Sequence, residues 1–567
     1  MPMSAYESKP WLQWYDEGVE PEIEIPDKTY LDFLEEGLSD NPDRPAFHFL
    51  GTTSTFKDLN NFSSRFAAYL SKNGFGTDDV VGINLPNIPQ FLIAMAGTIR
   101  AGCVVSGVSP LLTPKELNHQ LNDSGAKVLV TLDAFFEEKL LKIKENVPDL
   151  KTIIVTNLGD FLPLPKRFLG KLLKKIPTGK VEGITGKDVI SFSRILKESP
   201  AQKPDVNLSP DNTCLIQYTG GTTGPSKGVV LTHRNIVANT IHANRWLDVK
   251  LGEDISCSAF PFFHLAGMGL GLQMMALANA QILVPDPRNT DLICKDIVKY
   301  NPTFMYNVPT LYQMLLDNPV FKSIDFCDCR NCISGAAPFS VESINAFEGV
   351  VGKNKVVEAY GMTESSPGIT MNPYKGKKKV GSVGIPFPNT RVKLMNVNDG
   401  ITEVPVGEPG ELIANGPQVM KGYFNKPEET KNTLREINGE TWLYTGDVAR
   451  MDEDGFFFIV DRTKDMLLVG GYNVYSKQIE ETLYELPMIE FCAIIGVPNK
   501  DRPGSELVKA VIQLKSSEKS RDKTALEKEI IAHCRENLAP YKVPRIVEFV
   551  DAIPLTAVGK VDKKALR

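Results

Sequence analysis

The stretch DDVVGINLPNIPQFLIAMAGTIRAGCVVSGVSP, residues 78–110, decides the fold class. It contains a strand pattern, VVGINL, then a helix pattern that runs through Ala101, and then a second apolar strand pattern. An amphipathic helix pattern that ends near Gly74 precedes it. Strand, helix and strand at this spacing are typical of a parallel α/β layer.

The same alternation of strand and helix patterns returns further along the chain. It is seen in the runs KVLVT, KTIIVT, TCLIQYTG, QILVP, PTFMYNVPTLYQMLL and CISGAAP. After about Thr370 the strands become shorter and are separated by Gly and Pro turns, which indicates a mostly antiparallel β subdomain. Beyond DRTKD, residues 461–465, the strand patterns FCAIIGV, KAVIQL and RIVEFV and one amphipathic helix indicate a smaller α+β unit.

We therefore predict an α/β protein with a large N-terminal domain and a small α+β C-terminal domain. The large domain is expected to contain βαβ subdomains plus a β subdomain. The polar residues 462–464 form a linker that few contacts need to cross. The predicted domains are residues 1–461 and residues 465–567.

The composition is that of an ordinary globular protein, with 42% hydrophobic and 23% charged residues among 567. The net charge of -6 provides no basic field for nucleic acid, so small-molecule chemistry is the better starting hypothesis. The first residues, MPMSAYESKPWLQWYDEG, carry charges and lack the apolar core of a secretory signal, which favours a cytoplasmic protein.

Two segments bear on membrane contact. Residues 255–285 lack Asp, Glu, Lys and Arg, but they contain Pro261, His264 and Gln273, which favours a buried core segment over a membrane span. Residues 163–180 place apolar residues at helical spacing among lysines and an arginine. This second segment is either an interfacial helix at the inner face of a membrane or an edge helix that packs on its own domain.

The stretch YTGGTTGPSKG, residues 218–228, has the composition of a phosphate-binding loop. Its glycines let backbone N–H groups approach an anion, its hydroxyls donate hydrogen bonds, and its lysine adds positive charge. The candidate residues are Thr219, Gly220, Gly221, Thr222, Thr223, Gly224 and Lys227. The stretch is not a Walker motif, because Ser226 and Gly228 flank the lysine. Taken alone, it would also suit a glycine-rich surface turn.

Further motifs follow this loop in a fixed order. They are SGAAP at 334–338, YGMTE at 360–364, YTGD at 444–447, DRTKD at 461–465, GGYNV at 470–474 and PLTAVGKVDKKALR at 554–567. With the loop, this set resembles the adenylate-forming superfamily, which contains acyl-CoA synthetases, luciferases and the adenylation domains of peptide synthetases. The resemblance extends from about Leu31 to Arg567. It implies that a carboxylic acid and ATP form an acyl-AMP and pyrophosphate.

The resemblance also implies an ATP site built from most of these motifs. Glu364 is a hard-oxygen ligand that suits Mg²⁺, Thr222 would join it, and Thr363 would lie near the α-phosphate. Asp447 would accept both ribose hydroxyls, and Tyr360 would stack against adenine. The remaining nucleotide contacts are expected from Gly335, Ala336, Ala337 and Arg462.

Lys560 is the expected principal catalytic residue, because the corresponding lysine of the family stabilises the pentacoordinate transition state as a point charge. Since it lies on the small domain, the resemblance implies that this domain rotates about a hinge at Lys464. The second orientation would present a strand to the pantetheine arm of coenzyme A. The residues of that strand are Gly470, Gly471 and Tyr472. The sequence reads NVYSKQIE where the common pattern is NVYP-x-E-I-E, so it departs from the family at Ser476 and Gln478.

The acyl chain is expected to bind beside the segment PFFHLAGMGLGLQMM. His264, Gly267 and Gly271 share one helix face, which leaves room for one wall of a slot. A helix-packing groove is the other interpretation of these glycines, and a core histidine is the other interpretation of His264. The resemblance adds Gly361 and Met362 to the pocket, and it makes His264 a candidate catalytic residue.

The predicted function is that of an ATP-dependent, AMP-forming fatty acid:CoA ligase for medium- or long-chain acids. Its expected cofactors and substrates are ATP, Mg²⁺, coenzyme A and a fatty acid. An amino acid is disfavoured because no Asp early in the pocket segment could bind an α-amino group. The alternatives are an aryl or other carboxylate:CoA ligase, an acyl-AMP ligase that serves a carrier protein, and a non-catalytic nucleotide- or lipid-binding homologue. Acyl chain length and formation of a homodimer stay open.

Overall fold

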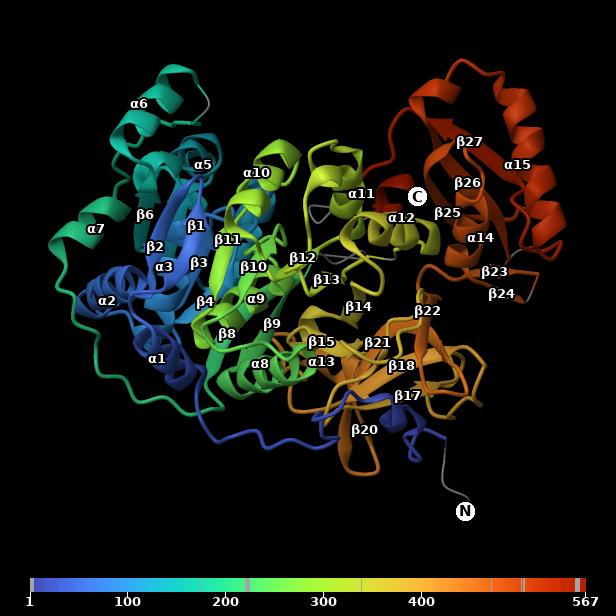
Figure 1. The fold of residues 1–567 in the computed structure, drawn as a ribbon, viewed down its shortest axis with the longest axis horizontal. Helices are drawn as coiled ribbons and strands as arrows, with labels where there is room; N and C mark the ends of the chain where they lie inside the picture. The colour runs from blue at the N-terminus through green and yellow to red at the C-terminus, as the bar shows by residue number, and fades with distance from the viewer. Residues whose placement is uncertain are drawn as a thin grey trace.

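The computed structural model describes residues 5–174, 176–219, 225–337, 339–470, 472–500, 502, 505–555 and 561–567. Figure 1 shows a large body of sheets and helices, with a smaller C-terminal lobe at its upper right. We use "C-terminal lobe" for residues 465–567 and "large body" for the residues before 462. This mixed α/β architecture confirms the predicted fold class. The linker at 462–464 remains a prediction.

The first sheet of the large body holds the strand–helix–strand unit that the sequence predicts. β3 (Val80–Asn84) leads into α3 (Pro89–Arg100) and β4 (Val104–Gly107), and β3 pairs in parallel with β4. The sheet runs in the order β19-β9-β8-β4-β3-β5-β6-β7. Its other strands are β5 (Val128–Leu132), β6 (Thr152–Thr156), β7 (Asp188–Ser191), β8 (Thr213–Thr219), β9 (Lys227–Thr232) and β19 (Gly422–Tyr423). β8 and β9 form an antiparallel hairpin, so the predicted phosphate loop joins their ends.

The second sheet runs in the order β16-β15-β14-β13-β12-β10-β11-β1-β2. Its strands are β1 (Pro45–Phe49), β2 (Thr52–Thr55), β10 (Ile255–Ser258), β11 (Ala280–Leu283), β12 (Phe304–Asn307), β13 (Asn331–Ser334), β14 (Val356–Gly361), β15 (Gly368–Met371) and β16 (Ile385–Pro386). β12, β13 and β14 pair in parallel. The segments that follow β13 and β14 therefore leave the sheet at the same edge, where ligands bind in open α/β sheets.

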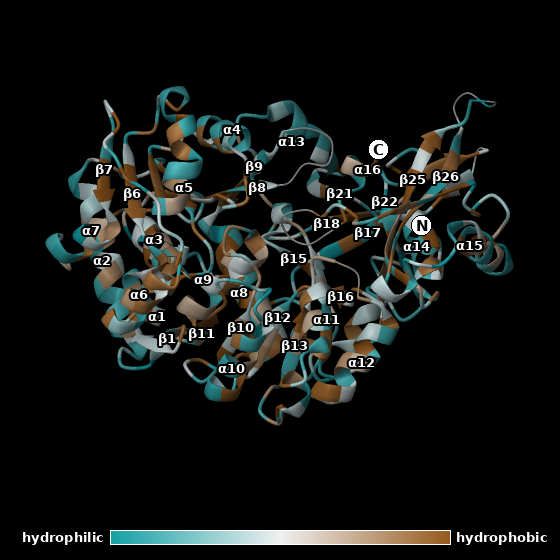
Figure 2. Cartoon of the chain, turned by 90° about the horizontal axis from the view of Figure 1, so that it is seen from above, coloured by the Kyte–Doolittle hydropathy of each residue, from teal (hydrophilic) through white to brown (hydrophobic). Residues whose placement is uncertain are grey.

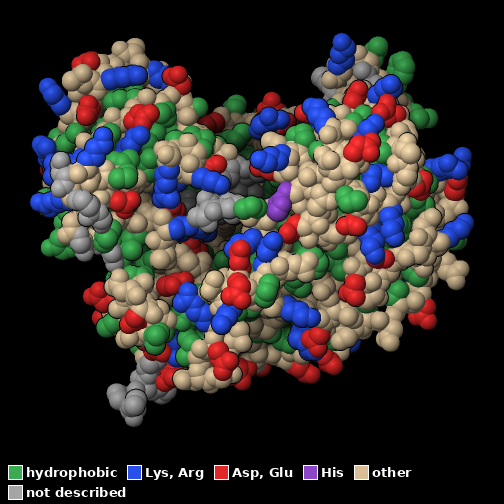
Figure 3. All heavy atoms as spheres, turned by 180° about the vertical axis from the view of Figure 1, so that it is seen from behind, with side chains coloured by type: hydrophobic (Ala, Val, Ile, Leu, Met, Phe, Trp, Pro, Cys, Tyr) green, Lys and Arg blue, Asp and Glu red, His purple; other side chains and the backbone are tan. Residues whose placement is uncertain are grey.

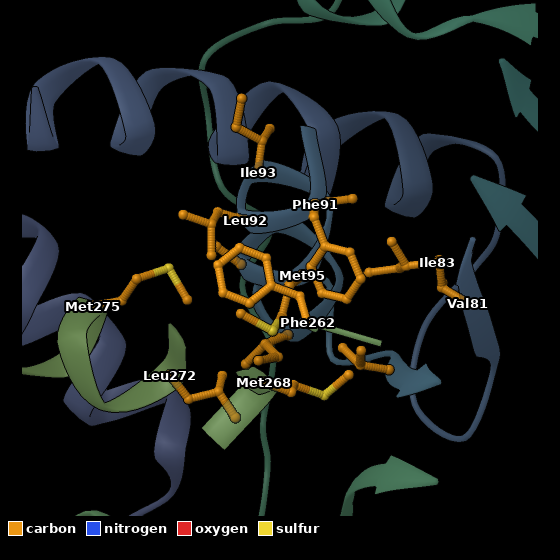
Figure 4. Packing of buried hydrophobic residues seen from close by; sticks show 14 of the residues in the cluster. Val81, Ile83, Phe91, Leu92, Ile93, Met95, Phe262, Met268, Leu272 and Met275 are labelled. Atoms are coloured by element: carbon orange, nitrogen blue, oxygen red, sulfur yellow. The ribbon is translucent and has the colours of Figure 1, made fainter. Parts of the chain in front are cut away.

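Helices of the large body cover these sheets. They are α1 (Tyr30–Asp40), α2 (Phe56–Lys72), α4 (Pro114–Ser124), α5 (Asp133–Glu138), α6 (Leu164–Leu172), α7 (Phe192–Glu198), α8 (His233–Leu247), α9 (Leu265–Ala276), α10 (Thr290–Tyr300), α11 (Pro309–Asp317) and α12 (Val341–Val351). Short 3₁₀ helices are η1 (Pro10–Trp14), η2 (Leu140–Lys142), η3 (Lys144–Asn146), η4 (Leu158–Phe161), η5 (Phe321–Ser323) and η6 (Thr363–Ser365). In Figure 4, Phe91 and Met95 of α3 lie against Phe262 and Met268, so the two buried helices α3 and α9 share one core.

The uncharged run 255–285 forms β10, α9 and β11 in the interior of the large body. This confirms the prediction of a buried core segment. In the part of the chain that the structure describes, no helix is long and apolar enough to span a membrane.

The β subdomain follows the second sheet, as the sequence predicts. Its strands are β17 (Arg391–Met395), β18 (Gly410–Asn415), β20 (Leu434–Ile437), β21 (Glu440–Met451) and β22 (Phe457–Arg462), and α13 (Pro427–Thr433) precedes β20. The order is β17-β18-β21-β20, with β22 paired to β21, and all of these pairs are antiparallel. β22 is the strand that leads toward the predicted hinge.

The C-terminal lobe forms a separate layer of strands and helices. Its elements are β23 (Leu467–Val469), β24 (Tyr472–Val474), α14 (Ser476–Tyr484), β25 (Ile489–Pro498), β26 (Glu506–Leu514), η7 (Ser516–Glu518), α15 (Lys523–Asn537), β27 (Ile546–Val550) and α16 (Lys563–Leu566). Figure 2 shows hydrophobic residues on β25 and β26, with α15 on the outer side of the lobe. Leu526, Ile530 and Cys534 of α15 pack into a core cluster of the lobe, as their helical spacing predicts.

Candidate active site

The ends of the β8–β9 hairpin hold two of the predicted phosphate-loop residues. Thr219 ends β8 and pairs with Lys227, the first residue of β9. Residues 220–224, which include Gly220, Gly221, Thr222, Thr223 and Gly224, lie outside the described residues. The structure therefore gives the two anchors of the loop, and the loop's role in phosphate binding stays a prediction.

Lys227 is linked to Glu364 through a tyrosine that the sequence reasoning did not select. The Lys227 ammonium lies 4.6 Å from the centroid of the Tyr423 ring and forms an ion pair with Glu429. The Tyr423 hydroxyl donates to Glu364 Oε1 at 2.7 Å. Tyr423 belongs to the run KGYFNKPEET, so the only sequence signal for it was this family-like run.

Glu364 is a buried carboxylate close to the end of β14. It lies in η6, directly after β14, and its side chain is buried together with Thr363. Burial raises the pKa of the Glu364 carboxyl, and the hydrogen bond from Tyr423 opposes that rise. A nearby cation would favour the ionised form, and a small hard ion needs few protein oxygens when phosphates supply the rest. Among the described residues, no group of three or more His, Cys, Asp or Glu side chains is arranged to hold a metal ion.

Tyr360 and Arg462, both partly exposed, meet at the buried carboxylate of Asp447. The Tyr360 hydroxyl donates to Asp447 Oδ2 at 2.7 Å, and Arg462 Nε lies 2.8 Å from Asp447 Oδ1. Asp447 and Arg462 face each other on the neighbouring strands β21 and β22. The charge of Asp447 raises the pKa of the Arg462 guanidinium. Three residues that the sequence predicts for the nucleotide site are thus brought together from three strands.

The predicted adenine-binding backbone lies next to Tyr360. Gly335, Ala336 and Ala337 follow β13, and β13 pairs in parallel with β14, which carries Tyr360. Ala336 has a positive φ of 67°, a conformation that L-residues rarely adopt. A Cβ atom added at Gly335 would lie 3.4 Å from the Ala359 carbonyl oxygen. These small residues therefore leave their backbone close to the tyrosine strand.

The predicted acyl-pocket glycines have different surroundings from one another. A Cβ atom at Gly267 would lie 2.3 Å from the Pro261 carbonyl oxygen, so this glycine lets α9 approach the preceding backbone. A Cβ atom at Gly271 would make ordinary contacts with Leu92, Met95 and Phe262. Gly267 therefore lets α9 pack closely on the loop before it, and Gly271 faces the apolar core between α3 and α9. The roles of both glycines in an acyl pocket stay predictions.

His264 and the turn after β14 complete this region. His264 is the N-terminal cap of α9, where its ring nitrogen accepts a hydrogen bond from the Ala266 N–H at 3.3 Å. Gly361 passes so close to the Pro367 carbonyl oxygen that a Cβ atom there would lie 1.7 Å from it. The Met362 N–H donates to the same oxygen at 2.9 Å. The roles of these residues in binding an acyl chain stay predictions.

The remaining predicted residues lie on the C-terminal lobe or outside the description. Lys560 and Gly471 fall outside the described residues. Gly470 and Tyr472 belong to the β23–β24 hairpin, which lies at the edge of the lobe in Figure 1, away from β14 and β21. In this orientation the described residues Gly470 and Tyr472 therefore lie away from the strands that carry Tyr360 and Asp447.

The chain is similar in sequence and in fold to known proteins. Sequence models described as AMP-binding enzyme and AMP-binding enzyme C-terminal domain match residues 34–424 and 478–560. The chain is 39% identical to a long-chain-fatty-acid–CoA ligase of Bacillus subtilis (strain 168), with 98% of this chain and 97% of the relative covered. It is 38% identical to a protein of the same name from Yersinia pestis, with 99% and 98% covered. A solved structure of an anthranilate CoA ligase with anthranoyl-AMP matches with a TM-score of 0.81 and 26% identity, covering 96% of this chain and 97% of that chain.

Asp447→Asn tests the predicted nucleotide role of Asp447. We expect AMP to bind about tenfold more weakly or worse, because a charge-assisted hydrogen bond to a ligand hydroxyl is lost. Isothermal titration calorimetry measures this affinity. The matched control is Asp211→Asn, which changes an exposed ion pair with Arg234 beyond the opposite end of β8. If Asp447→Asn binds AMP as tightly as the wild type, Asp447 does not contribute to nucleotide binding.

Proposed function

The chain belongs to the AMP-binding enzyme family, and we propose that it is an AMP-forming ligase that joins a fatty acid to coenzyme A. Two relatives that are 39% and 38% identical over nearly the whole chain carry the name long-chain-fatty-acid–CoA ligase. The structural observation that supports the proposal best is the contact of Tyr360 and Arg462 with the buried Asp447, near η6, which carries Glu364.

The first half-reaction joins the acid to the α-phosphorus of ATP. A carboxylate oxygen forms a bond to that phosphorus, and the bond to pyrophosphate breaks. Both reactants are anions, so the site must place positive charge and N–H donors around the phosphates before they react. Lys227 is proposed to neutralise the departing phosphates, and Lys560 is proposed to stabilise the charge that develops at the α-phosphorus.

The nucleotide is proposed to bind against the edge of the second sheet. Asp447 would accept the ribose hydroxyls, and the Tyr360 ring would face adenine. The hydrogen bond from the Tyr360 hydroxyl to Asp447 holds the ring and the carboxylate in a fixed relation. Gly335, Ala336 and Ala337 would let a flat base approach their backbone, because no large side chain stands there.

Mg²⁺ is proposed to accompany ATP, and when bound it would neutralise part of the triphosphate charge. Glu364 would hold it, with Thr222 as a second protein ligand. A single buried carboxylate, linked through Tyr423 to Lys227, fits this ion, since Mg²⁺ is usually bound through one or two carboxylates plus substrate phosphates. Thr363 would lie near the α-phosphate, because it precedes Glu364 in η6.

The second half-reaction transfers the acyl group from AMP to coenzyme A. The sulfur forms a bond to the acyl carbon, the bond from that carbon to the AMP oxygen breaks, and the thiol proton is released. Gly470, Gly471 and Tyr472 are proposed as coenzyme A contacts. Their use requires the C-terminal lobe to rotate about Lys464, the proposed hinge.

The acyl chain is proposed to bind near α9, on the side where Gly271 faces α3. The side chains there include Met95 and Phe262, and flexible methionines can repack around an apolar chain. His264 caps α9 and would lie at the carboxylate end of this region. The runner-up substrate is an aromatic acid, since the anthranilate CoA ligase structure shares the fold.

An acid profile tests the proposed function most simply. We expect pyrophosphate release with ATP and coenzyme A to favour aliphatic acids, with kcat/KM rising about threefold to fourfold per added CH₂ group until the pocket is filled. A pyrophosphate-coupled assay across aliphatic acids of increasing length and benzoates measures this. A clear preference for benzoates would show that the substrate is an aromatic acid and not a fatty acid. Absence of acyl-AMP formation with every acid would support a non-catalytic homologue.

Residues 163–180 are also proposed to contact a membrane peripherally. On α6, Leu164 is 78% exposed, Phe168 is 72% exposed and Leu172 is 66% exposed, so these three side chains do not pack on their own domain. In Figure 3 this part of the molecule lies at the upper right, where hydrophobic side chains stand beside Lys and Arg side chains. An exposed apolar stripe among basic residues suits the surface of an anionic bilayer.

Formation of a homodimer remains a separate prediction, which a sedimentation-velocity measurement checks.

Vesicle binding tests the proposed membrane contact. The protein should sediment with vesicles that contain phosphatidylglycerol and much less with phosphatidylcholine vesicles, because both apolar and electrostatic attraction contribute. Replacing Phe168 and Leu172 together by Glu should weaken binding at least about tenfold, since apolar insertion is lost. Ile401→Glu, at a 79% exposed apolar residue of the β subdomain, is the matched control. Equal sedimentation of wild type and the double variant would exclude α6 as the contact.

A further inference from the structure

Two residues on opposite sides of the predicted hinge form a buried contact. Asp461 lies near the end of β22, before Lys464, and Ser476 is the first residue of α14, after it. The Asp461 carboxylate accepts hydrogen bonds from the Ser476 backbone N–H and, at 3.1 Å, from the Ser476 hydroxyl. Asp461 is 5% exposed and Ser476 is 0% exposed, so water does not compete strongly for these bonds.

Lys563 extends this contact to the C-terminal segment. Its ammonium donates to Ser476 Oγ at 2.6 Å and pairs with Glu480 of α14 at 2.7 Å. A hydroxyl can donate one hydrogen bond and accept another, so Ser476 fits between the carboxylate and the ammonium. We call the chain of contacts from Asp461 through Ser476 and Lys563 to Glu480 the latch.

A second contact crosses the hinge beside the latch. The Lys477 ammonium donates to the Ile459 carbonyl oxygen at 2.6 Å. Lys464 lies between the partners of both contacts in the sequence. A rotation of the C-terminal lobe about Lys464 therefore carries Ser476 and Lys477 away from β22, and the latch exists in one orientation only.

In this orientation the β23–β24 hairpin faces outward. Tyr472 is 59% exposed and stacks on Tyr541 of the same lobe, with ring centroids 4.6 Å apart. The C-terminal end lies on the side of the lobe that faces the large body in both Figure 1 and Figure 2, and Arg567 pairs with Asp465 at 2.9 Å. The segment that follows Lys560 therefore lies on the side of the lobe toward the large body, whereas the exposed Tyr472 of the hairpin does not.

We propose that Ser476 is a positioning residue, whose latch stabilises the lobe orientation that serves acyl-AMP formation. The proposal rests on the proposed function, because it assumes two half-reactions that need different orientations. The latch stabilises only the orientation in which it forms. Its loss therefore shifts the population toward the orientation that serves transfer to coenzyme A.

Proline at position 476 would remove the latch and preserve the helix. Proline has neither a backbone N–H nor a hydroxyl, and it is the residue that the common family pattern places here. Ser476 is the first helical residue of α14, a position where proline is favoured. Tyr475 has extended backbone angles, φ -88° and ψ 117°, which suit a residue before proline. Ser476→Ala is the milder variant, since it keeps the N–H and loses only the hydroxyl.

The test measures the two half-reactions separately in full-length wild type, Ser476→Ala and Ser476→Pro. We expect acyl-AMP formation to slow by about tenfold in Ser476→Pro and by less in Ser476→Ala. Thioester formation from supplied acyl-AMP and coenzyme A should stay unchanged or become faster. Lys523→Pro, at the exposed first residue of α15, is the matched control and should leave both rates unchanged.

Equal loss of both half-reactions would overturn the proposal, because it would indicate a purely structural defect. No change in either half-reaction would overturn it as well. Small-angle X-ray scattering of the same variants adds a measurement that needs no catalysis. Ser476→Pro should change the scattering curve, and Lys523→Pro should not. If wild type forms no acyl-AMP with any acid, the proposed function fails and scattering alone decides: a curve unchanged by Ser476→Pro overturns the latch.

Discussion

The buried carboxylate of Asp447 is the group on which the arrangement of the site depends. It accepts the Tyr360 hydroxyl at 2.7 Å and lies 2.8 Å from Arg462 Nε. Tyr360 belongs to the second sheet, Asp447 to the β subdomain, and Arg462 ends the strand before the predicted hinge. A buried carboxylate without partners is costly, so these three parts of the chain are held together by the same charge.

Strand β22 connects the proposed nucleotide site to the orientation of the C-terminal lobe. Successive side chains of a strand point to opposite faces, and Asp461 and Arg462 are neighbours on β22. Arg462 points to Asp447, whereas Asp461 binds Ser476 of the lobe. The proposed binding of a nucleotide by Arg462 would therefore act on the strand that carries the proposed latch. This offers a physical route by which occupancy of the site could be linked to lobe orientation.

Much of this arrangement follows from sequence patterns, because hydrophobic periodicity reports local structure directly. The strand–helix–strand unit around α3 and the change to antiparallel strands after Thr370 both follow from such patterns. The meeting of Tyr360 with Asp447 was expected only through the family resemblance, since no local pattern relates residues so far apart.

Contacts between distant segments were the part that sequence reasoning missed. Tyr423 of β19 reaches Glu364 of η6, and nothing in the spacing of either residue indicates that bond. Gly267 is explained by a close backbone approach that depends on how the loop before α9 folds. Ser476 was visible as a departure from a family pattern, but its partner Asp461 became evident only from the structure.

Transfer of ¹⁸O from a labelled fatty acid to AMP tests the formation of acyl-AMP most directly. The protein is incubated with ATP, coenzyme A and acid labelled in both carboxylate oxygens, and AMP is analysed by mass spectrometry. We predict a single ¹⁸O atom in each AMP, because the oxygen that bonds to the α-phosphorus stays there when sulfur attacks the acyl carbon. Unlabelled AMP, or label in pyrophosphate, would contradict attack of the carboxylate on the α-phosphorus.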